Sequence, residues 1–101
     1  MVPDKNKILS AIYGAIDIVN EALPKERRGQ KTPDALLYGP SGFLDSLGMT
    51  IFVVQLEQKL QDETGAAITL ADHSIMFAEQ SPFRTVQTLT EHIVSRMEAG
   101  T

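Results

Sequence analysis

The sequence predicts an all-α fold: a four-helix bundle of three longer helices and one short third helix, forming a single domain over residues 1–101. Three observations indicate this fold. Apolar residues recur at spacings of three and four in three separate segments, which is the period of an amphipathic helix. No segment shows the alternation of apolar and polar residues that is typical of a strand. One long irregular stretch separates the first two helical segments, as in bundles with a crossover connection.

The composition is that of a globular domain, and it excludes several classes of function. Of the 101 residues, 43% are hydrophobic, and the formal net charge is −4. A chain of this length buries one core, and its negative charge argues against general nucleic-acid binding. No apolar run approaches the roughly 18 residues of a membrane span, and no secretion signal is recognisable. We therefore expect a monomeric cytoplasmic protein without a membrane span.

The chain contains no cysteine, which excludes disulfides, thiolate metal sites and a thiol nucleophile carried by the chain itself. Its two histidines, His73 and His92, are 19 positions apart and form no metal-ligand pattern. We therefore expect no metal site. If thioester chemistry takes place on this protein, an added group must supply the thiol.

The first helix is expected to begin at Asp4, whose carboxylate can accept a hydrogen bond from a backbone N–H of the first turn. It ends before Pro24, because the residue that precedes a proline avoids the helical conformation. Apolar residues at helical spacing predict one buried face. These residues are Ile8, Ile12, Ala15, Val19 and Leu23.

Residues 24–45 form a long loop with several glycines and prolines, and loops of this length usually have a function. We expect Leu36, Leu37 and Tyr38 to attach it to the core. Its basic residues form a patch that is either a solvated surface or a docking site for an acidic surface. This basic patch consists of Lys25, Arg27, Arg28 and Lys31.

The second helix is predicted from about Ser46 to Glu63, with Gly65 as its C-terminal stop. Apolar residues follow two lines along it. The second line either packs under the long loop or offers an apolar patch to a partner. The first line, expected to be buried, is Met49, Phe52, Val53, Leu56 and Leu60, and the second is Leu47, Ile51 and Val54.

A short extended connection at residues 66–70 is followed by a predicted short third helix at about residues 72–79. Ser81 and Pro82 mark a break, and Thr85 is the expected N-cap of the last helix. Gly100 closes this helix. Its apolar residues at helical spacing are Val86, Leu89, Ile93 and Met97.

The candidate functional residue is Ser46, at the start of the second helix. One interpretation is that it only caps this helix, because serine is favoured at that position. Alternatively, its hydroxyl carries a phosphodiester, which the partial positive charge and unpaired N–H groups of a helix N-terminus would favour. The neighbouring Asp45 would then help to hold a metal ion while the phosphate is transferred.

With these features the chain resembles the acyl carrier protein superfamily over roughly residues 6–97. The absence of cysteine is consistent with the resemblance. The residues that carry it are Leu44-Asp45-Ser46-Leu47, the helix pattern of Phe52, Val53, Leu56 and Glu57, and Phe83-Arg84-Thr85-Val86 with Leu89 and Ile93.

The resemblance implies a four-helix bundle without catalysis of its own. A phosphopantetheinyl transferase would move 4′-phosphopantetheine from coenzyme A onto Ser46, and Asp45 would assist through the transferase's magnesium. The terminal thiol of this arm would carry an acyl or aminoacyl group as a thioester. The implied partners are the transferase and the enzymes that load and use the acyl group, with Leu47 among the contacts.

The predicted partner face differs from that of fatty acid synthesis carriers, which usually have acidic residues along the exposed side of the second helix. Here Gly48 and Ile51 stand where acids are common. We expect Leu47, Ile51, Val54 and Glu57 to contact partners, on a face that is more apolar than acidic. Asp-Ser-Leu-Gly also resembles the D-alanyl carrier proteins of teichoic acid modification. We therefore expect a specialised carrier rather than the general fatty acid carrier.

Other functions remain as alternatives. An unmodified helical module for protein–protein interaction would use the line Leu47, Ile51 and Val54 as a groove. A serine hydrolase is disfavoured, because Gly42 precedes Ser46 by four positions rather than the two of a nucleophile elbow. A DNA-binding domain is disfavoured because the basic residues of this chain cluster in a loop and not on a helix that could enter a DNA groove.

A further question is whether the bundle shelters an acyl chain. Apolar residues of three segments either line a cleft between helices for this chain or form ordinary core. They are Phe52, Val53, Leu56, Ile75, Met76 and Leu89.

Overall fold

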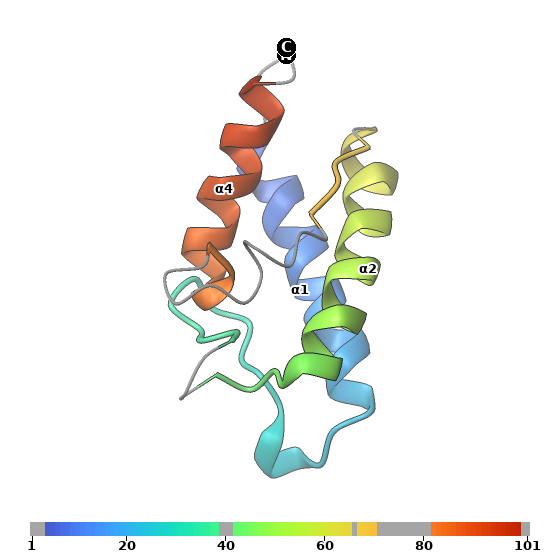
Figure 1. Cartoon of the computed structure of the whole chain (residues 1–101), viewed down its shortest axis with the longest axis vertical. Coiled ribbons are helices and arrows are strands. Elements are labelled where there is room, and N and C mark those ends of the chain that lie inside the picture. The colour runs from blue at the N-terminus through green and yellow to red at the C-terminus, as the bar shows by residue number, and fades with distance from the viewer. Residues whose placement is uncertain (1–3, 39–41, 66, 71–81, 100–101) are drawn as a thin grey trace.

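The computed structural model describes residues 4–38, 42–65, 67–70 and 82–99 (Figure 1). This part of the chain contains three α-helices and no β-strand, so the predicted all-α class is confirmed. The four-helix count is not confirmed, because the expected third helix at 72–79 lies outside the described residues, as does Gly100. The elements are α1 (Lys5–Glu21), α2 (Ser46–Thr64), α4 (Val86–Ala99), and the 3₁₀ turns η1 (Lys25–Arg27) and η2 (Pro82–Arg84).

Helix α1 begins as predicted. Asp4 Oδ1 accepts hydrogen bonds from the backbone N–H groups of Asn6 and Lys7, at 2.9 and 3.4 Å. The helix ends at Glu21, three residues before Pro24. Its buried face includes four of the five predicted positions, whereas Leu23 lies past the helix end and is only half-buried. The buried residues are Ile8, Ala11, Ile12, Ala15, Ile16 and Val19.

Helix α2 begins and ends, and α4 begins, largely as the sequence predicts. Gly65 ends α2 with a left-handed backbone (φ 76°), a conformation that a residue with a Cβ adopts at a cost. Thr85 caps α4: its Oγ1 accepts from the Thr88 N–H and its own N–H donates to Thr88 Oγ1, both at 3.1 Å. This reciprocal pair satisfies two backbone donors at the helix start.

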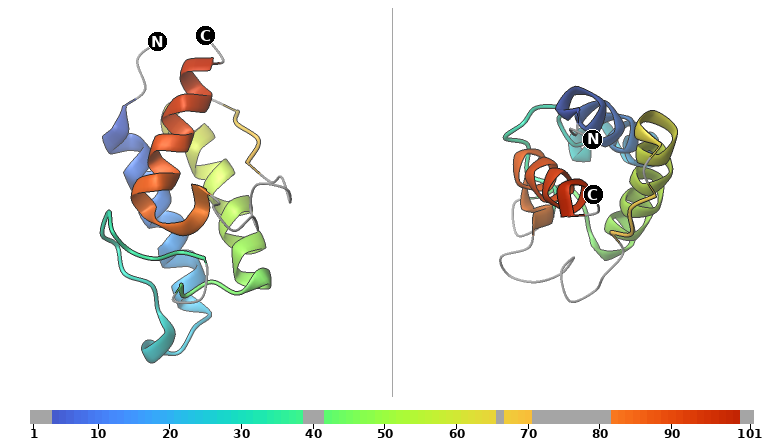
Figure 2. Two further views of the ribbon diagram at one scale, coloured as in Figure 1. Left: turned by 60° about the vertical axis from the view of Figure 1, so that its left-hand side comes forward. Right: turned by 90° about the horizontal axis from the view of Figure 1, so that it is seen from above.

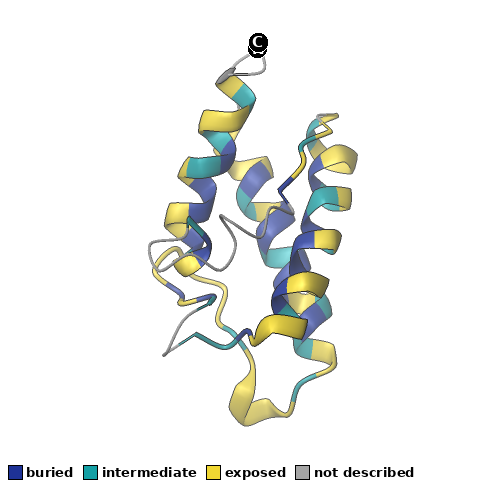
Figure 3. Cartoon of the chain, in the orientation of Figure 1, coloured by how far each residue is buried: buried dark blue, intermediate teal, exposed yellow. Residues whose placement is uncertain are grey.

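The core lies between the three helices, which surround it when the bundle is seen from above (Figure 2). Buried residues follow the inner side of each helix, and exposed residues the outer side (Figure 3). All five residues of the first apolar line of α2 are fully buried, as predicted. The described members of the proposed acyl cleft, Phe52, Val53, Leu56 and Leu89, are core residues with 0% exposure. Ile75 and Met76 lie outside the described residues.

The loop between α1 and α2 is attached to the start of α4 through its backbone. Leu37 N–H donates to the Arg84 carbonyl at 2.7 Å, and Tyr38 N–H donates to the Phe83 carbonyl at 3.2 Å. Successive side chains of an extended segment point to opposite sides. Leu37 is therefore buried and Tyr38 partly buried, whereas the prediction that Leu36 packs on the core is wrong, since it is 44% exposed.

Candidate functional site

Asp45, and not Ser46, caps α2. Asp45 has an extended backbone and its Oδ1 accepts the Gly48 N–H at 2.7 Å, whereas Ser46 is the first helical residue. The interpretation that Ser46 caps the helix is therefore wrong. Both residue types are favoured caps and stand side by side, so the sequence alone did not decide between them.

The hydroxyl of Ser46 is left available by this arrangement. Ser46 is exposed, and its hydroxyl makes no hydrogen bond with any residue of the described segments. The first N–H groups of a helix have no intrahelical partner. The Asp45 side chain satisfies that of Gly48, and the Asp45 carbonyl accepts the first intrahelical hydrogen bond, from the Met49 N–H at 2.8 Å. Within the described segments the N–H groups of Ser46 and Leu47 have no acceptor, and they can interact with an anion at the start of α2.

Gly48 allows the capping contact to form, a role that the sequence analysis missed. A Cβ at this position would lie 3.1 Å from Asp45 Oδ1 and 3.3 Å from Leu44 Cδ2, closer than most real contacts. Leu44 is buried and its N–H donates to the Leu37 carbonyl at 2.9 Å. The signal was present in the sequence as a glycine three residues after an aspartate cap.

The second apolar line of α2 is an exposed patch. Leu47, Ile51 and Val54 are 70%, 41% and 46% exposed, so the expectation that they pack under the long loop is wrong. The described part of the loop is instead hydrogen-bonded to the segment just before α4. Glu57 is placed differently from these three: it is partly buried, and its Oε2 accepts the Leu70 N–H at 2.6 Å.

The basic patch is partly engaged in holding the loop. Lys31 forms an ion pair with Asp17 at 3.1 Å. Arg28 Nε donates to the carbonyls of Asn20 and Leu23 at 3.0 and 3.1 Å, and so binds the C-terminal end of α1, where cations are favoured. Lys25 and Arg27, the other two basic residues, are exposed, and neither side chain has a hydrogen bond or ion pair within the described segments.

The serine hydrolase alternative would require a histidine, His73, beside Ser46 and Asp45. His73 lies outside the described residues. His92, on α4, packs against Phe83 with ring centroids 6.4 Å apart. Burial, and secondarily the charge of Arg96, lowers the pKa of His92. Within the described segments no group of acidic and histidine side chains could hold a metal ion, and none of their helices is long and apolar enough to cross a membrane.

The assignment of the cap predicts different stability effects at two neighbouring positions. Asp45→Ala is expected to lower the free energy of unfolding by about 1 kcal/mol, because the Gly48 N–H loses its acceptor. Ser46→Ala is expected to change it by less than about 0.5 kcal/mol, as for other surface substitutions. Urea unfolding followed by circular dichroism measures both. A larger loss for Ser46→Ala than for Asp45→Ala would show that the serine is the cap.

Comparisons of the chain with protein-family models, with curated proteins and with solved structures found no match.

Proposed function

We propose that this chain is an acyl carrier protein, in which Ser46 is the attachment point of a covalent 4′-phosphopantetheine arm. The observation that carries the proposal is the exposed hydroxyl of Ser46 on the first turn of α2, released from capping by Asp45. A side chain that an enzyme must modify has to be accessible, and Ser46 meets this condition.

The residues around Ser46 suit attachment of a phosphodiester. Ser46 Oγ would attack the phosphorus of coenzyme A that bears the pantetheine. A new O–P bond forms, the bond to the departing adenosine 3′,5′-bisphosphate breaks, and the hydroxyl proton passes to a base of the transferase. The N–H groups of Ser46 and Leu47 and the positive end of α2 stabilise the charge of the product. Once attached, the arm supplies the thiol that the cysteine-free chain lacks.

Asp45 has one carboxylate oxygen to spare for this reaction. Its Oδ1 accepts the Gly48 N–H, whereas its Oδ2 has no hydrogen-bond partner in the described segments. Carboxylate oxygens are ligands that Mg²⁺ prefers. In the proposal Asp45 therefore caps α2 with one oxygen and approaches the transferase's magnesium with the other.

The partners proposed for the loaded carrier are enzymes that attach and use its acyl or aminoacyl group. They would contact the exposed patch of Leu47, Ile51 and Val54, which begins one residue after Ser46. An apolar face requires an apolar complement on the partner. This supports a specialised carrier with dedicated partners rather than the general carrier of fatty acid synthesis. As part of the same proposal, the carrier acts in the cytoplasm and has no catalysis of its own.

The test is intact-protein mass spectrometry after incubation with coenzyme A, Mg²⁺ and a broad-specificity phosphopantetheinyl transferase. We expect the mass to increase by one phosphopantetheine group in the wild type and not in Ser46→Ala. Thr50→Ala is the matched control: it removes an exposed hydroxyl from the same end of α2, one that donates to the Ser46 carbonyl at 3.1 Å. It is expected to be modified fully. Modification of Ser46→Ala would refute the site.

A second candidate function rests on the same exposed patch. A helical interaction module would bind its partner through Leu47, Ile51 and Val54 without any modification of Ser46. Absence of modification by the transferases of the native cell, on a folded protein, would favour this alternative.

A further inference from the structure

A groove lies between the turn η1 and the segment that leads into α2. Its volume is about 500 Å³, within the range of about 300–1,000 Å³ that is typical of small-molecule sites. The sequence indicated two of its residues, Arg27 and Arg28, as part of the basic patch, but not the groove itself. The groove is lined by Glu26, Arg27, Arg28, Gly29, Gln30, Asp34, Ala35, Leu36, Gly42 and Phe43.

The walls of this groove are held in place by contacts between α1, the loop that follows it and the segment that leads into α2. The side-chain amide of Asn20 binds Gly29 at two points, accepting its N–H at 2.8 Å and donating to its carbonyl at 3.1 Å. The ring of Phe43 lies so close to Gly29 that a Cβ there would be 2.4 Å from it. Arg28 is fixed to the end of α1 through its Nε. The groove is therefore formed before any ligand arrives.

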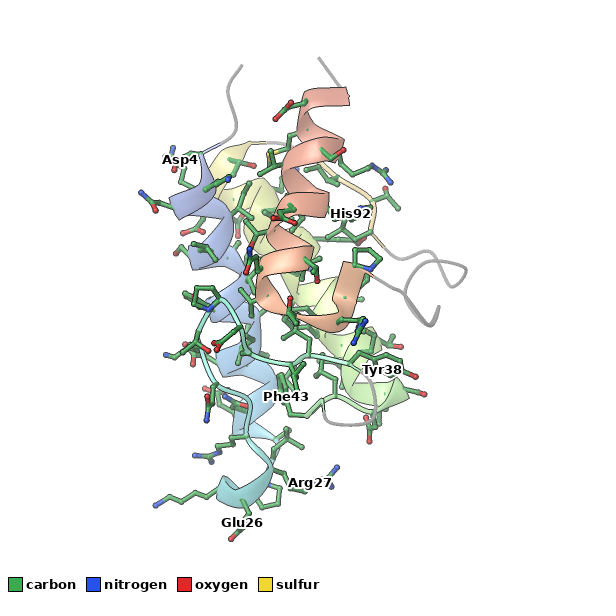
Figure 4. All side chains as sticks on the ribbon, turned by 90° about the vertical axis from the view of Figure 1, so that its left-hand side faces the viewer. Asp4, Glu26, Arg27, Tyr38, Phe43 and His92 are labelled. Atoms are coloured by element: carbon green, nitrogen blue, oxygen red, sulfur yellow. The ribbon has the colours of Figure 1, made fainter. Side chains whose placement is uncertain are left out.

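The groove lies beside a basic segment of an acidic chain, and its own lining holds two arginines, Arg27 and Arg28, and two acids. Residues 25–31 carry four basic side chains and one acidic side chain, a net charge of +3, although the whole chain has −4. Of the acids in the lining, Asp34 accepts the Thr32 hydroxyl at 2.8 Å. Glu26 points away from the bundle at the tip of the turn (Figure 4). Arg27 lines the groove and is exposed, and its guanidinium has no hydrogen-bond or ion-pair partner among the described residues.

We propose that this groove binds the terminal carboxylate of an acyl group carried on Ser46, so that the cargo is the half-thioester of a dicarboxylic acid. This inference rests on the proposed carrier function. A guanidinium is suited to bind a carboxylate, and Phe43, Leu36 and Ala35 provide an apolar wall for the methylene chain. Phe43 is three residues from Ser46, at most about 11 Å along the chain, so a flexible arm on Ser46 spans the distance.

The experiment compares two cargoes of equal length, one with a terminal carboxylate and one with a methyl group. The carrier is loaded by the transferase directly from succinyl-coenzyme A or from butyryl-coenzyme A, and loading is verified by mass. Backbone NMR spectra of the two forms are then compared. We expect the amide signals of Arg27, Gly29, Gln30 and Phe43 to shift with the succinyl group and to keep their unloaded positions with the butyryl group.

Two variants with equal loss of charge locate the contact. In Arg27→Gln, the succinyl-dependent shifts are expected to fall to the butyryl level. In Lys25→Gln they are expected to persist, because Lys25 is in the same turn but does not line the groove. Loss of the shifts in both variants would mean a diffuse charge effect and would contradict a site at Arg27.

The remaining outcomes separate this inference from the carrier function. If the signals of Arg27, Gly29, Gln30 and Phe43 keep their unloaded positions with both cargoes, the carboxylate site is overturned and the carrier function is left intact. Equal shifts with both cargoes would show that the groove holds the arm rather than the carboxylate, and would also overturn it. If no transferase loads Ser46, the carrier function is refuted, and this inference is refuted with it.

Discussion

Phe52→Ala is expected to lower the free energy of unfolding by about 3–5 kcal/mol, among the largest stability effects expected from a single side chain here. Phe52 is 0% exposed and lies in the middle of the buried face of α2. Its removal leaves a cavity that the neighbouring helices fill only in part. Because a domain of this size is stable by only about 5–15 kcal/mol, the variant is expected to be partly unfolded at elevated temperature. Guanidinium unfolding at 25 °C measures the loss.

The control for this prediction lies on the opposite side of the same helix. Leu47→Ala removes an apolar side chain that is 70% exposed, and the expected change is within about 0.5 kcal/mol. The pair tests which face of α2 is buried, independently of any function. A loss below about 1 kcal/mol for Phe52→Ala would contradict the core described above.

Asp45→Asn is expected to slow the attachment of phosphopantetheine by at least about tenfold, because a metal-ion contact that stabilises transferred charge is worth several kcal/mol. Asparagine retains the oxygen that accepts the Gly48 N–H, so α2 stays capped. It lacks the negative charge and second carboxylate oxygen that we assign to the transferase's magnesium. The initial rate of modification, followed by mass, measures the effect.

The unfolding curve of the same variant serves as the control. Asp45→Asn is expected to keep the wild-type free energy of unfolding within about 0.5 kcal/mol, since asparagine is as favourable a cap as aspartate. A slow reaction with unchanged stability would separate the two roles of Asp45. Modification at the wild-type rate would instead show that Asp45 serves only as a cap.

The helices could be predicted from the sequence because the signals for them are local. The N-cap Asp4, the stop at Gly65 and the period of the buried residues of α2 all act within a few residues of where they stand. The same is true of Thr85 at the start of α4. Each of these features satisfies backbone groups or marks the face of a helix that will be buried, and it can be recognised without knowledge of distant parts of the chain.

The parts of the site that depend on contacts between distant segments could not be predicted. Whether Leu47, Ile51 and Val54 are buried depends on whether the loop crosses α2. The loop backbone instead donates hydrogen bonds to the carbonyls of Phe83 and Arg84. The groove depends on a contact between Asn20 and Gly29 and on another between Gly29 and Phe43. No spacing in the sequence predicts these contacts, because they follow from the path of an irregular segment.

The central claim is that Ser46 carries phosphopantetheine, and the most direct test is to map the modification on protein purified from the cells that produce it naturally. Trypsin, which cleaves after lysine and arginine, releases residues 32–59 as one peptide. Fragmentation mass spectrometry then distinguishes Ser46 from the other hydroxyl side chains of this peptide. These are Thr32, Tyr38, Ser41 and Thr50.

The account predicts one phosphopantetheine group on Ser46 and none on the other four hydroxyl groups. A peptide that is unmodified throughout, in cells whose transferases modify other carriers, would contradict the carrier function. Modification of another of these residues would contradict the site.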